Sequence, residues 1–180
     1  MSNTNKIIIL GLGGQGVITA GKLIAEAGFN SGYQVSFLPT TGPQIHNGSV
    51  QAEIIISNEK IYNPFIYKAN YVLVFHKFRL EDAKQYLTDE SILICKDFST
   101  ISNYEHLGMK VNTEVLDNSR YSNIFMVGAF NYYSDLFNDK DISTGLKRLF
   151  FNKPFNIVNL NFKAYKLGKD NQKAINKANV

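Results

Sequence analysis

Residues 6–16 of this 180-residue chain read Lys-Ile-Ile-Ile-Leu-Gly-Leu-Gly-Gly-Gln-Gly, and this stretch decides the fold. The β-branched run before Gly11 is typical of a strand buried on both faces in a parallel sheet. After the glycines, apolar residues recur at helical spacing as far as Gly28, which predicts a helix over about residues 15–30. A second strand at residues 34–38 then completes a βαβ unit.

The sequence after this unit predicts further strands and helices. Residues 50–57, the polar pair Asn58-Glu59 and residues 60–62 indicate a hairpin, and therefore an antiparallel strand in the sheet. The remaining elements follow from short apolar runs, typical of strands, or from helical spacing. The expected strands are 71–75, 92–95 and 109–111, and the expected helices are 80–87, 124–137, 143–151 and a segment from Phe155 onward.

The composition indicates a globular protein. With 44% apolar residues, 19% charged residues and 4 prolines, the chain has the make-up of a folded protein rather than a disordered one. Its length suits one core, so we expect a single domain over residues 1–180. No apolar run approaches the ~18 to 20 residues of a membrane span, and the first eleven residues do not form a signal peptide. We therefore expect a cytoplasmic protein without a membrane partner.

Cys95 is the only cysteine, which limits the chemistry of the chain. One thiol cannot form an intramolecular disulfide, a four-cysteine zinc site or the ligand set of an iron–sulfur cluster. Because Cys95 ends the apolar run at residues 91–95, we expect an inert buried thiol rather than a nucleophile.

The three histidines lie in separate regions without metal-binding spacing: His46, His76 and His106. His76 follows a predicted strand at its carboxyl end, where α/β folds bind ligands, but a hydrogen-bonded loop histidine is the favoured interpretation. No Gly-x-Ser-x-Gly elbow of a hydrolase is present. The sequence therefore predicts no metal site and no catalytic residue.

The basic residues gather near the carboxyl end. Residues 144–180 hold eight lysines and arginines against one acid, Asp170. A solvated helix face is the favoured interpretation, and docking on an acidic partner is the alternative. Nucleic acid is not an expected partner, because the segment from Lys169 to Val180 contains no aromatic residue for stacking.

Gly11, Gly13 and Gly16 fit the Gly-x-Gly-x-x-Gly pattern in the context that the pattern requires, between a strand and a helix. Glycine allows positive φ and close backbone approach, and the amides and dipole at the helix start attract an anion. The side-chain amide of Gln15 can hydrogen-bond a ligand or the loop itself. A tight turn without a ligand is the alternative, since such turns also serve packing.

An ordinary nicotinamide dinucleotide site requires an acid about 20 residues beyond the glycines. Residues 37–42 stand at that place and read Phe-Leu-Pro-Thr-Thr-Gly, with neither a carboxylate nor an arginine. Residues 16–22 imitate a phosphate-binding Walker A loop, but Leu23 replaces the Ser or Thr that holds magnesium. The sequence therefore argues against an NAD site and against nucleotide hydrolysis, and Lys22 is expected to be an exposed helix residue.

Several motifs along the chain form a distinctive set. They are Gly-Leu-Gly-Gly-Gln-Gly-Val at 11–17, Pro-Thr-Thr-Gly-Pro at 39–43 in a loop that runs to Gly48, the strands at 53–57 and 69–74 with Lys60-Ile61, Asn123 with Gly128, and Asn-Phe-Lys-Ala-Tyr-Lys-Leu-Gly at 161–168. Together they resemble the gamma subunit of 2-oxoacid:ferredoxin oxidoreductases. The resemblance covers nearly the whole chain. It implies a three-layer, Rossmann-like α/β domain with a mostly parallel, mixed sheet.

The resemblance also implies a function. Such enzymes oxidatively decarboxylate a 2-oxoacid, for example pyruvate, 2-oxoglutarate or indolepyruvate, to an acyl-CoA and reduce ferredoxin. Thiamine diphosphate and the iron–sulfur clusters belong to the alpha, beta and delta subunits, which leaves the gamma subunit without a cofactor of its own. The implied partners are the alpha and beta subunits, with a delta subunit in some assemblies and ferredoxin as an indirect partner. The chain alone is expected to be inactive.

The resemblance places the glycine loop and the loop at residues 39–48 against the catalytic subunits, where they shape the active site or its access for CoA. The candidate cofactor-binding residues are Gly11, Gly13, Gly14, Gln15, Gly16, Thr40, Thr41, Gly42, His46 and Gly48. The second loop departs from the family pattern Tyr-Gly-Pro-Glu-x-Arg-Gly-Gly. The tyrosine, the acid, the arginine and the first glycine of the final pair are replaced by Thr41, Gln44, His46 and Asn47. A histidine cannot copy the bidentate pairing of that arginine with an anion.

Two other functions stay open on the sequence alone. The runner-up is a free-standing Rossmann-like module that binds a nucleotide or CoA, and an independent NAD-linked enzyme comes third.

Overall fold

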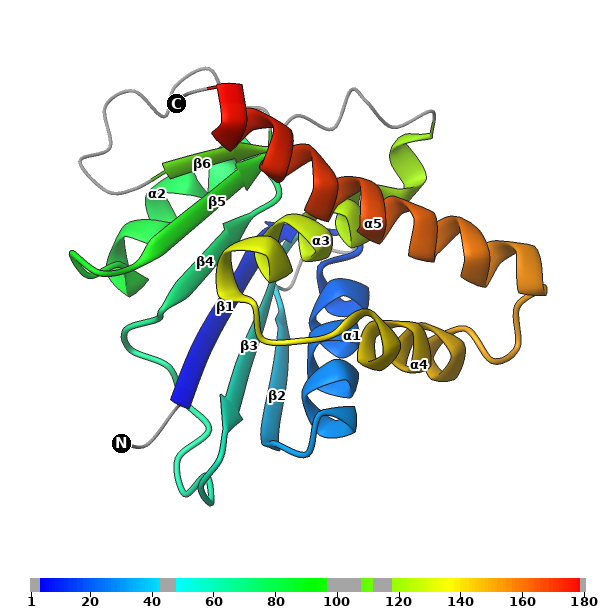
Figure 1. Ribbon diagram of the computed structural model, residues 1–180. Helices are drawn as coiled ribbons and strands as arrows, with labels where there is room; N and C mark the ends of the chain where they lie inside the picture. Colours follow the sequence, from blue (N-terminus) through cyan, green and yellow to red (C-terminus); the bar gives the residue numbers. More distant parts are fainter. Residues whose placement is uncertain (1–3, 43–47, 97–107, 112–117, 179–180) are drawn as a thin grey trace.

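The computed structural model describes residues 4–42, 48–96, 108–111 and 118–178, and within them a six-stranded sheet forms the centre of the molecule (Figure 1). The strands are β1 (Thr4–Leu12), β2 (Gln34–Thr41), β3 (Ser49–Ser57), β4 (Tyr71–Val74), β5 (Ile92–Lys96) and β6 (Gly108–Val111). The strand order is β2-β3-β1-β4-β5-β6. Strands β1, β4, β5 and β6 are parallel neighbours, so the expected mixed, mostly parallel sheet is confirmed.

The antiparallel strand is β3, which lies between β1 and β2 and pairs with both. Ile54 faces Ile7 across one pairing and Phe37 across the other. The predicted hairpin partner at residues 60–62 was wrong, because that segment is not a strand and Tyr62 is 85% exposed. A strand whose isoleucines are buried on both faces belongs inside a sheet, and the segment at residues 60–62 offers no such neighbour.

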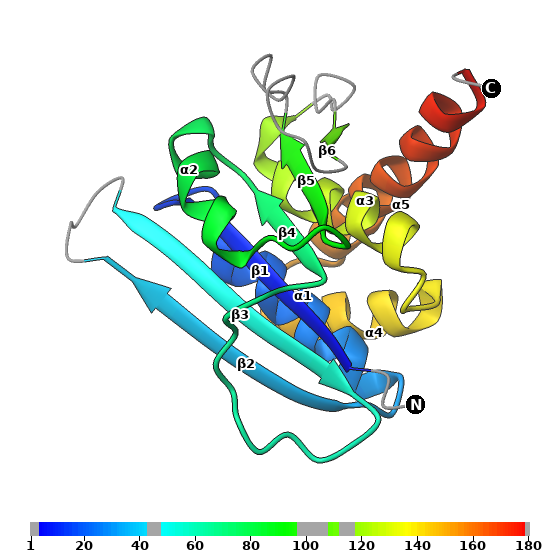
Figure 2. The same cartoon turned by 90° about the vertical axis from the view of Figure 1, so that its left-hand side faces the viewer.

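Helices cover the two faces of the sheet unequally (Figure 2). One face carries α1 (Val17–Asn30), α3 (Ser122–Ser134), α4 (Asp139–Leu149) and α5 (Phe155–Ala178). The other face carries the short α2 (Leu80–Ala83) with the 3₁₀ turns η1 (Lys77–Arg79) and η2 (Lys84–Tyr86), and a further turn, η4 (Ser119–Tyr121), precedes α3. No helix in these described ranges combines the length and apolar character that crossing a bilayer requires.

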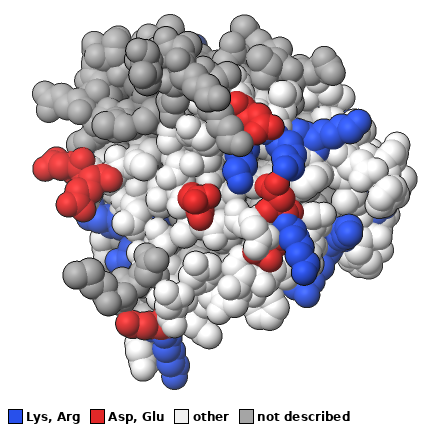
Figure 3. All heavy atoms as spheres, in the orientation of Figure 1, with Lys and Arg blue, Asp and Glu red and all other residues white. Residues whose placement is uncertain are grey.

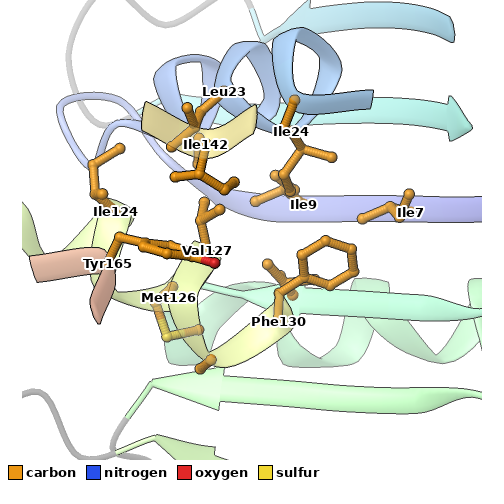
Figure 4. Close-up of a cluster of buried hydrophobic side chains, with 14 of the residues drawn as sticks. Ile7, Ile9, Leu23, Ile24, Ile124, Met126, Val127, Phe130, Ile142 and Tyr165 are labelled. Carbon is orange, nitrogen blue, oxygen red and sulfur yellow. The ribbon is translucent and has the colours of Figure 1, made fainter. Parts of the chain in front are cut away.

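The isoleucines of β1 alternate between two apolar cores. Ile7 and Ile9 pack under α1 and α3, together with the helix residues that Figure 4 labels, among them Leu23, Val127 and Phe130. The next residues along the strand, Ile8 and Leu10, point into the second core, beside α2. Successive side chains of a strand point to opposite faces, so a strand that is apolar throughout serves both cores.

The helix predicted at residues 80–87 is irregular. Only Leu80–Ala83 are α-helical, and the flanking turns are 3₁₀. At the end of the segment, the Tyr86 carbonyl accepts a hydrogen bond from the Ala69 N–H at 2.9 Å. This carbonyl is therefore not available to a further helical turn. The helix predicted at 124–137 ends earlier than expected, at Ser134, because Asp135 adopts a left-handed conformation with φ of 49°.

Two glycines let α3 and α5 approach closely. A Cβ on Gly128 would lie 2.1 Å from the Tyr165 carbonyl oxygen, and a Cβ on Gly168 would lie 2.1 Å from the Phe125 carbonyl oxygen. Beside this crossing the fully buried Tyr165 hydroxyl contacts Asn131 Nδ2 at 2.8 Å. The motif at residues 161–168 therefore serves helix packing, since its tyrosine and glycine both face α3.

Charged residues near the carboxyl end pair within the chain. Lys166 contacts a carboxylate oxygen of Asp139, and Lys169 Nζ lies 3.7 Å from the other oxygen. Arg148 lies 3.3 Å from Glu26 of α1. Figure 3 shows basic side chains next to acidic ones on the face that it presents. The basic excess of this segment is thus partly neutralised by acids from other elements.

Candidate functional site

The glycine loop and the described ends of the second loop lie together at the carboxyl edge of the parallel strands. The Gly13 N–H donates to the Gly48 carbonyl at 2.9 Å, and the Gly42 N–H donates to the Ser49 carbonyl at 2.7 Å. Leu12 pairs with Ser49, so β1 ends where β3 begins. These contacts place the two loops side by side.

The other residues of the second loop divide into two groups. Thr40 and Thr41 end β2 with exposed side chains, and Thr41 pairs with Val50 of β3. His46 lies outside the described residues, together with the rest of 43–47. The ends of the loop are therefore placed at the edge, and the binding roles of all its candidate residues stay predictions.

The three motif glycines have different reasons to be glycine. A Cβ on Gly11 would lie 2.5 Å from Val17 Cγ2 and 3.2 Å from Phe75 Cβ, so β1 passes close to α1 and β4 at this point. Gly16 has φ of 74°, in the left-handed region, and is the N-cap of α1. Gly13 holds the second loop through its N–H. Packing and turn geometry thus account for part of the motif without a ligand.

The exposed tip of the loop is Gly14, with φ of 83° and no atom within 4 Å of an added Cβ. Beyond it, α1 begins at Val17 without a side-chain cap in the described structure. The first amides of a helix have no intrahelical partner and carry the positive end of the dipole. The start of α1 therefore offers donors to a group brought from outside.

Gln15 closes the loop on itself. Its side-chain oxygen accepts a hydrogen bond from the Leu12 N–H at 2.8 Å, and its own N–H donates to the Leu12 carbonyl at 3.2 Å. The sequence left two roles open for this side-chain amide, binding a ligand or stabilising the loop. The contact between its oxygen atom and Leu12 supports the second role. This pair of bonds fixes the turn between β1 and α1.

Arg79 is a site residue that the sequence reasoning missed. The residue is 9% exposed, and its Nη1 donates to the Gly11 carbonyl at 3.3 Å. Its Nε lies 2.5 Å from Asp82 Oδ2. A buried arginine thus stands behind the glycine loop, held by one acid of the neighbouring turn. No short motif marks it, and the available signal was its place shortly after the carboxyl end of β4.

His76 and Phe78 complete this part of the edge. His76 Nδ1 accepts a hydrogen bond from the Phe78 N–H at 3.4 Å, and the two rings lie 4.9 Å apart. Partial burial, followed by the charges of Lys77 and Lys96, lowers the pKa of His76, which favours the neutral form of the ring. Phe78 is 72% exposed. The favoured interpretation of His76 as a hydrogen-bonded loop histidine agrees with this geometry.

Asn123 joins α3 to the glycine loop. Its Nδ2 donates to the Gly16 carbonyl at 3.3 Å, and a Cβ on Gly16 would lie 2.3 Å from the same nitrogen. The residue is 8% exposed. Asn123 was noted on the sequence only as part of a resemblance, and the structure gives its physical role: it holds the start of α1 against α3.

The described residues do not fit an iron–sulfur cluster or another metal. Cys95 is fully buried on β5, and burial raises the pKa of its thiol to about 12. A buried thiol of this kind is neither a ready ligand nor a nucleophile. Among the residues that the structure describes, His, Cys, Asp and Glu form no group of three that could hold an ion.

The fold and this edge define a class: a Rossmann-like α/β domain whose glycine loop is braced by a buried arginine and lacks the acid of a dinucleotide site. The family described as pyruvate ferredoxin/flavodoxin oxidoreductase matches residues 6–171, and the chain belongs to this family. The resemblance seen in the sequence motifs is therefore confirmed.

A relative and two solved structures illustrate the similarity. The chain is 23% identical over 171 residues to the ketoisovalerate oxidoreductase subunit VorA of Methanothermobacter marburgensis, covering 92% of this chain and 36% of that relative's length. The keto/oxoacid ferredoxin oxidoreductase gamma subunit from Geobacter sulfurreducens has a TM-score of 0.75 at 20% identity, covering 93% of this chain and 95% of that one. The 2-oxoglutarate:ferredoxin oxidoreductase from Magnetococcus marinus, with 2-oxoglutarate, coenzyme A and succinyl-CoA bound, has a TM-score of 0.83 at 21% identity, covering 95% of this chain and 31% of that one. The expected gamma-type fold is confirmed.

Proposed function

We propose that this chain is the gamma-type subunit of a cytoplasmic, thiamine diphosphate-dependent 2-oxoacid:ferredoxin oxidoreductase. In this proposal alpha and beta subunits, with a delta subunit in some assemblies, hold the thiamine diphosphate and the clusters, and the complex converts a 2-oxoacid to an acyl-CoA while it reduces ferredoxin. The chain spans about a third of the VorA relative, which suits one part of a larger assembly. The chain has one cysteine as a possible cluster ligand, and that thiol is buried, which suits a subunit without redox groups.

The observation that carries the proposal is the hydrogen bond between the two loops, from Gly13 to Gly48. This hydrogen bond brings the exposed loop tip, the uncapped start of α1 and the end of β2 together into one surface. We propose that this surface closes a pocket that the catalytic subunits complete. The candidate residues act there through backbone amides and, in the second loop, through hydroxyl groups, which suit the phosphate or carboxylate groups of CoA or a 2-oxoacid.

Arg79 supports the loop that forms that pocket. Its guanidinium pairs with Asp82 and donates to the Gly11 carbonyl, so it holds the loop backbone from below without standing on the surface. In our proposal Arg79 is a positioning residue that keeps the loop in its open geometry. We expect Arg79→Gln to raise the KM for CoA or the 2-oxoacid in the assembled enzyme, and Arg79→Lys to restore part of the loss.

Phe78 supports a partner surface at the same edge. An aromatic ring left 72% exposed beside the loops is typical of a residue that another subunit covers. Phe29, 64% exposed at the far end of α1, provides a matched control at the opposite edge of the sheet.

Co-expression with the neighbouring alpha and beta subunits tests the proposal. We expect the wild-type chain and the Phe29→Ser variant to co-purify with both subunits in gel filtration, and Phe78→Ser to be depleted from the complex at unchanged circular dichroism. A wild-type chain that elutes alone as a monomer, and that a nucleotide or CoA stabilises by itself, would instead support the free-standing module.

A further inference from the structure

A cavity of about 380 Å³ lies between the beginnings of α1, α3 and α5. Its walls come from separate elements: Thr19 on α1, Arg120 and Tyr121 of η4, Asn123 on α3, Phe150 and Lys153 before α5, and Ile157 and Asn161 on α5. No residue of the glycine loop lines it. Asn123 is the link between the two places, because it also hydrogen-bonds the Gly16 carbonyl.

The lining of this cavity contains two cations, Arg120 and Lys153, and no acid. A larger cavity of about 460 Å³ also has basic residues, but there Arg148 lies 3.3 Å from Glu26, which is part of the same wall. A third cavity of about 360 Å³ is lined by Glu53 and lacks a cation. Of these three cavities, the one between the helix starts alone is lined by cations without any acid.

Both cations stand on turns whose backbone is fixed. The Arg120 N–H donates to Asn118 Oδ1 at 2.9 Å, which caps the η4 turn. The Lys153 N–H donates to the Phe150 carbonyl at 2.8 Å. The two turns lead directly into α3 and α5, whose amino-terminal dipoles add positive potential of the same sign. The two exposed cations thus line one cavity from two separate turns.

The remaining walls provide hydrogen bonds and apolar surface. Asn161 is 4% exposed, and its Nδ2 is engaged with the Ile157 carbonyl at 2.8 Å, which holds the amide at the cavity wall. Tyr121 and Phe150 are half-buried aromatic residues. A hollow that combines apolar walls with fixed polar groups is typical of small-molecule sites, and 380 Å³ lies within their usual size.

We propose that this cavity binds a phosphorylated small molecule with a planar ring, of the class of nucleoside diphosphates. Arg120 and Lys153 pair with the phosphates, and the aromatic walls contact the ring. The proposal does not depend on the oxidoreductase assembly, because every lining residue belongs to this chain.

Isothermal titration of the full chain with ADP tests the proposal, with adenosine and inorganic pyrophosphate as comparison ligands. We expect ADP to bind with a Kd below about 1 mM, pyrophosphate to bind more weakly, and adenosine to bind at least about tenfold more weakly than ADP. Arg120→Gln with Lys153→Gln should weaken ADP at least about tenfold, whereas Arg120→Lys with Lys153→Arg should retain binding.

The control variant combines Lys140→Gln and Lys147→Gln, two exposed lysines of α4 outside the cavity lining, and removes the same charge. The proposal is overturned if ADP does not bind the wild-type chain at millimolar concentration, if adenosine binds as well as ADP, or if the control loses as much affinity. Co-purification with the alpha and beta subunits, measured on the same variants, reports on the oxidoreductase proposal separately, since we expect it to be unchanged.

Discussion

The close crossing of α3 and α5 predicts that Gly128→Ala destabilises the folded protein. The added Cβ would lie 2.1 Å from the Tyr165 carbonyl oxygen and 3.0 Å from the Lys169 nitrogen. Ordinary contact begins near 3.4 Å, so the helices must separate by about 1.3 Å. The obstacle is backbone on a neighbouring helix, which cannot turn away as a flexible side chain does.

The expected destabilisation follows from two opposing effects. Overpacking of a core costs about 1–3 kcal/mol, and a backbone clash belongs at the upper end of that range. Replacing a helical glycine by alanine contributes about 1 kcal/mol in favour of the folded state. We therefore expect Gly128→Ala to lower the free energy of unfolding by about 2 kcal/mol.

Gly145→Ala on α4 is the matched control. Its Cβ would meet side-chain atoms of Glu26 and Leu23 at 3.2 Å, which requires a shift of a few tenths of an ångström. The same gain in helix propensity applies, so this variant should stay within about 1 kcal/mol of the wild type. Urea unfolding followed by circular dichroism measures both variants, with the midpoint and the slope compared.

The outcome that refutes the packing argument is an unfolding midpoint for Gly128→Ala equal to or above that of Gly145→Ala at the same slope. Combining Gly128→Ala with Gly168→Ala adds a second test. Both glycines serve one helix crossing, so we expect the double variant to lose less stability than the sum of the single losses.

Three further predictions concern buried or paired side chains. Tyr165→Phe should cost about 1–2 kcal/mol in urea unfolding, because the buried Asn131 amide keeps the Phe137 carbonyl but loses its second acceptor, the Tyr165 hydroxyl at 2.8 Å; a loss below about 0.5 kcal/mol would contradict this role. Cys95, with its pKa raised to about 12 by burial, should resist a thiol reagent at pH 8 in the folded chain and react at once in urea; equal rates in both states would contradict its burial. Burial raises the pKa of Asp139, but Lys166 and Lys169 outweigh it and hold this pKa below the ordinary value, so the stabilisation is present above about pH 4 and is lost as the pH falls further. The difference in unfolding midpoint between wild type and Asp139→Asn should therefore shrink from pH 6 to pH 3, and a constant difference would count against the pairing.

Much of the fold was predictable because local patterns determine it. The apolar run before Gly11 and the helical spacing after Gly16 gave β1 and α1, and both were confirmed. The partner of β3 was not predictable from neighbouring residues, since its pairings join segments distant in sequence. Local turn signals favoured residues 60–62, but burial of both faces of β3 required two long neighbours.

The candidate site shows the same division. The glycine positions and their neighbourhood with Gly48 followed from motif and topology, because carboxyl ends of parallel strands share one edge. Arg79 and Asn123 were missed as site residues because their roles depend on contacts with Gly11 and Gly16 from distant elements. A motif describes a local stretch of backbone, whereas the groups that support that stretch come from elsewhere.

The place of β3 has a consequence for synthesis on the ribosome. A nascent chain that ends before Ser49 contains β1, α1 and β2, but it lacks β3, the strand that lies between β1 and β2 and pairs with both. Their backbone edges stay open until translation has passed Ser57. The amino-terminal third of the protein therefore exposes unpaired strand edges during the interval in which residues 42–57 emerge.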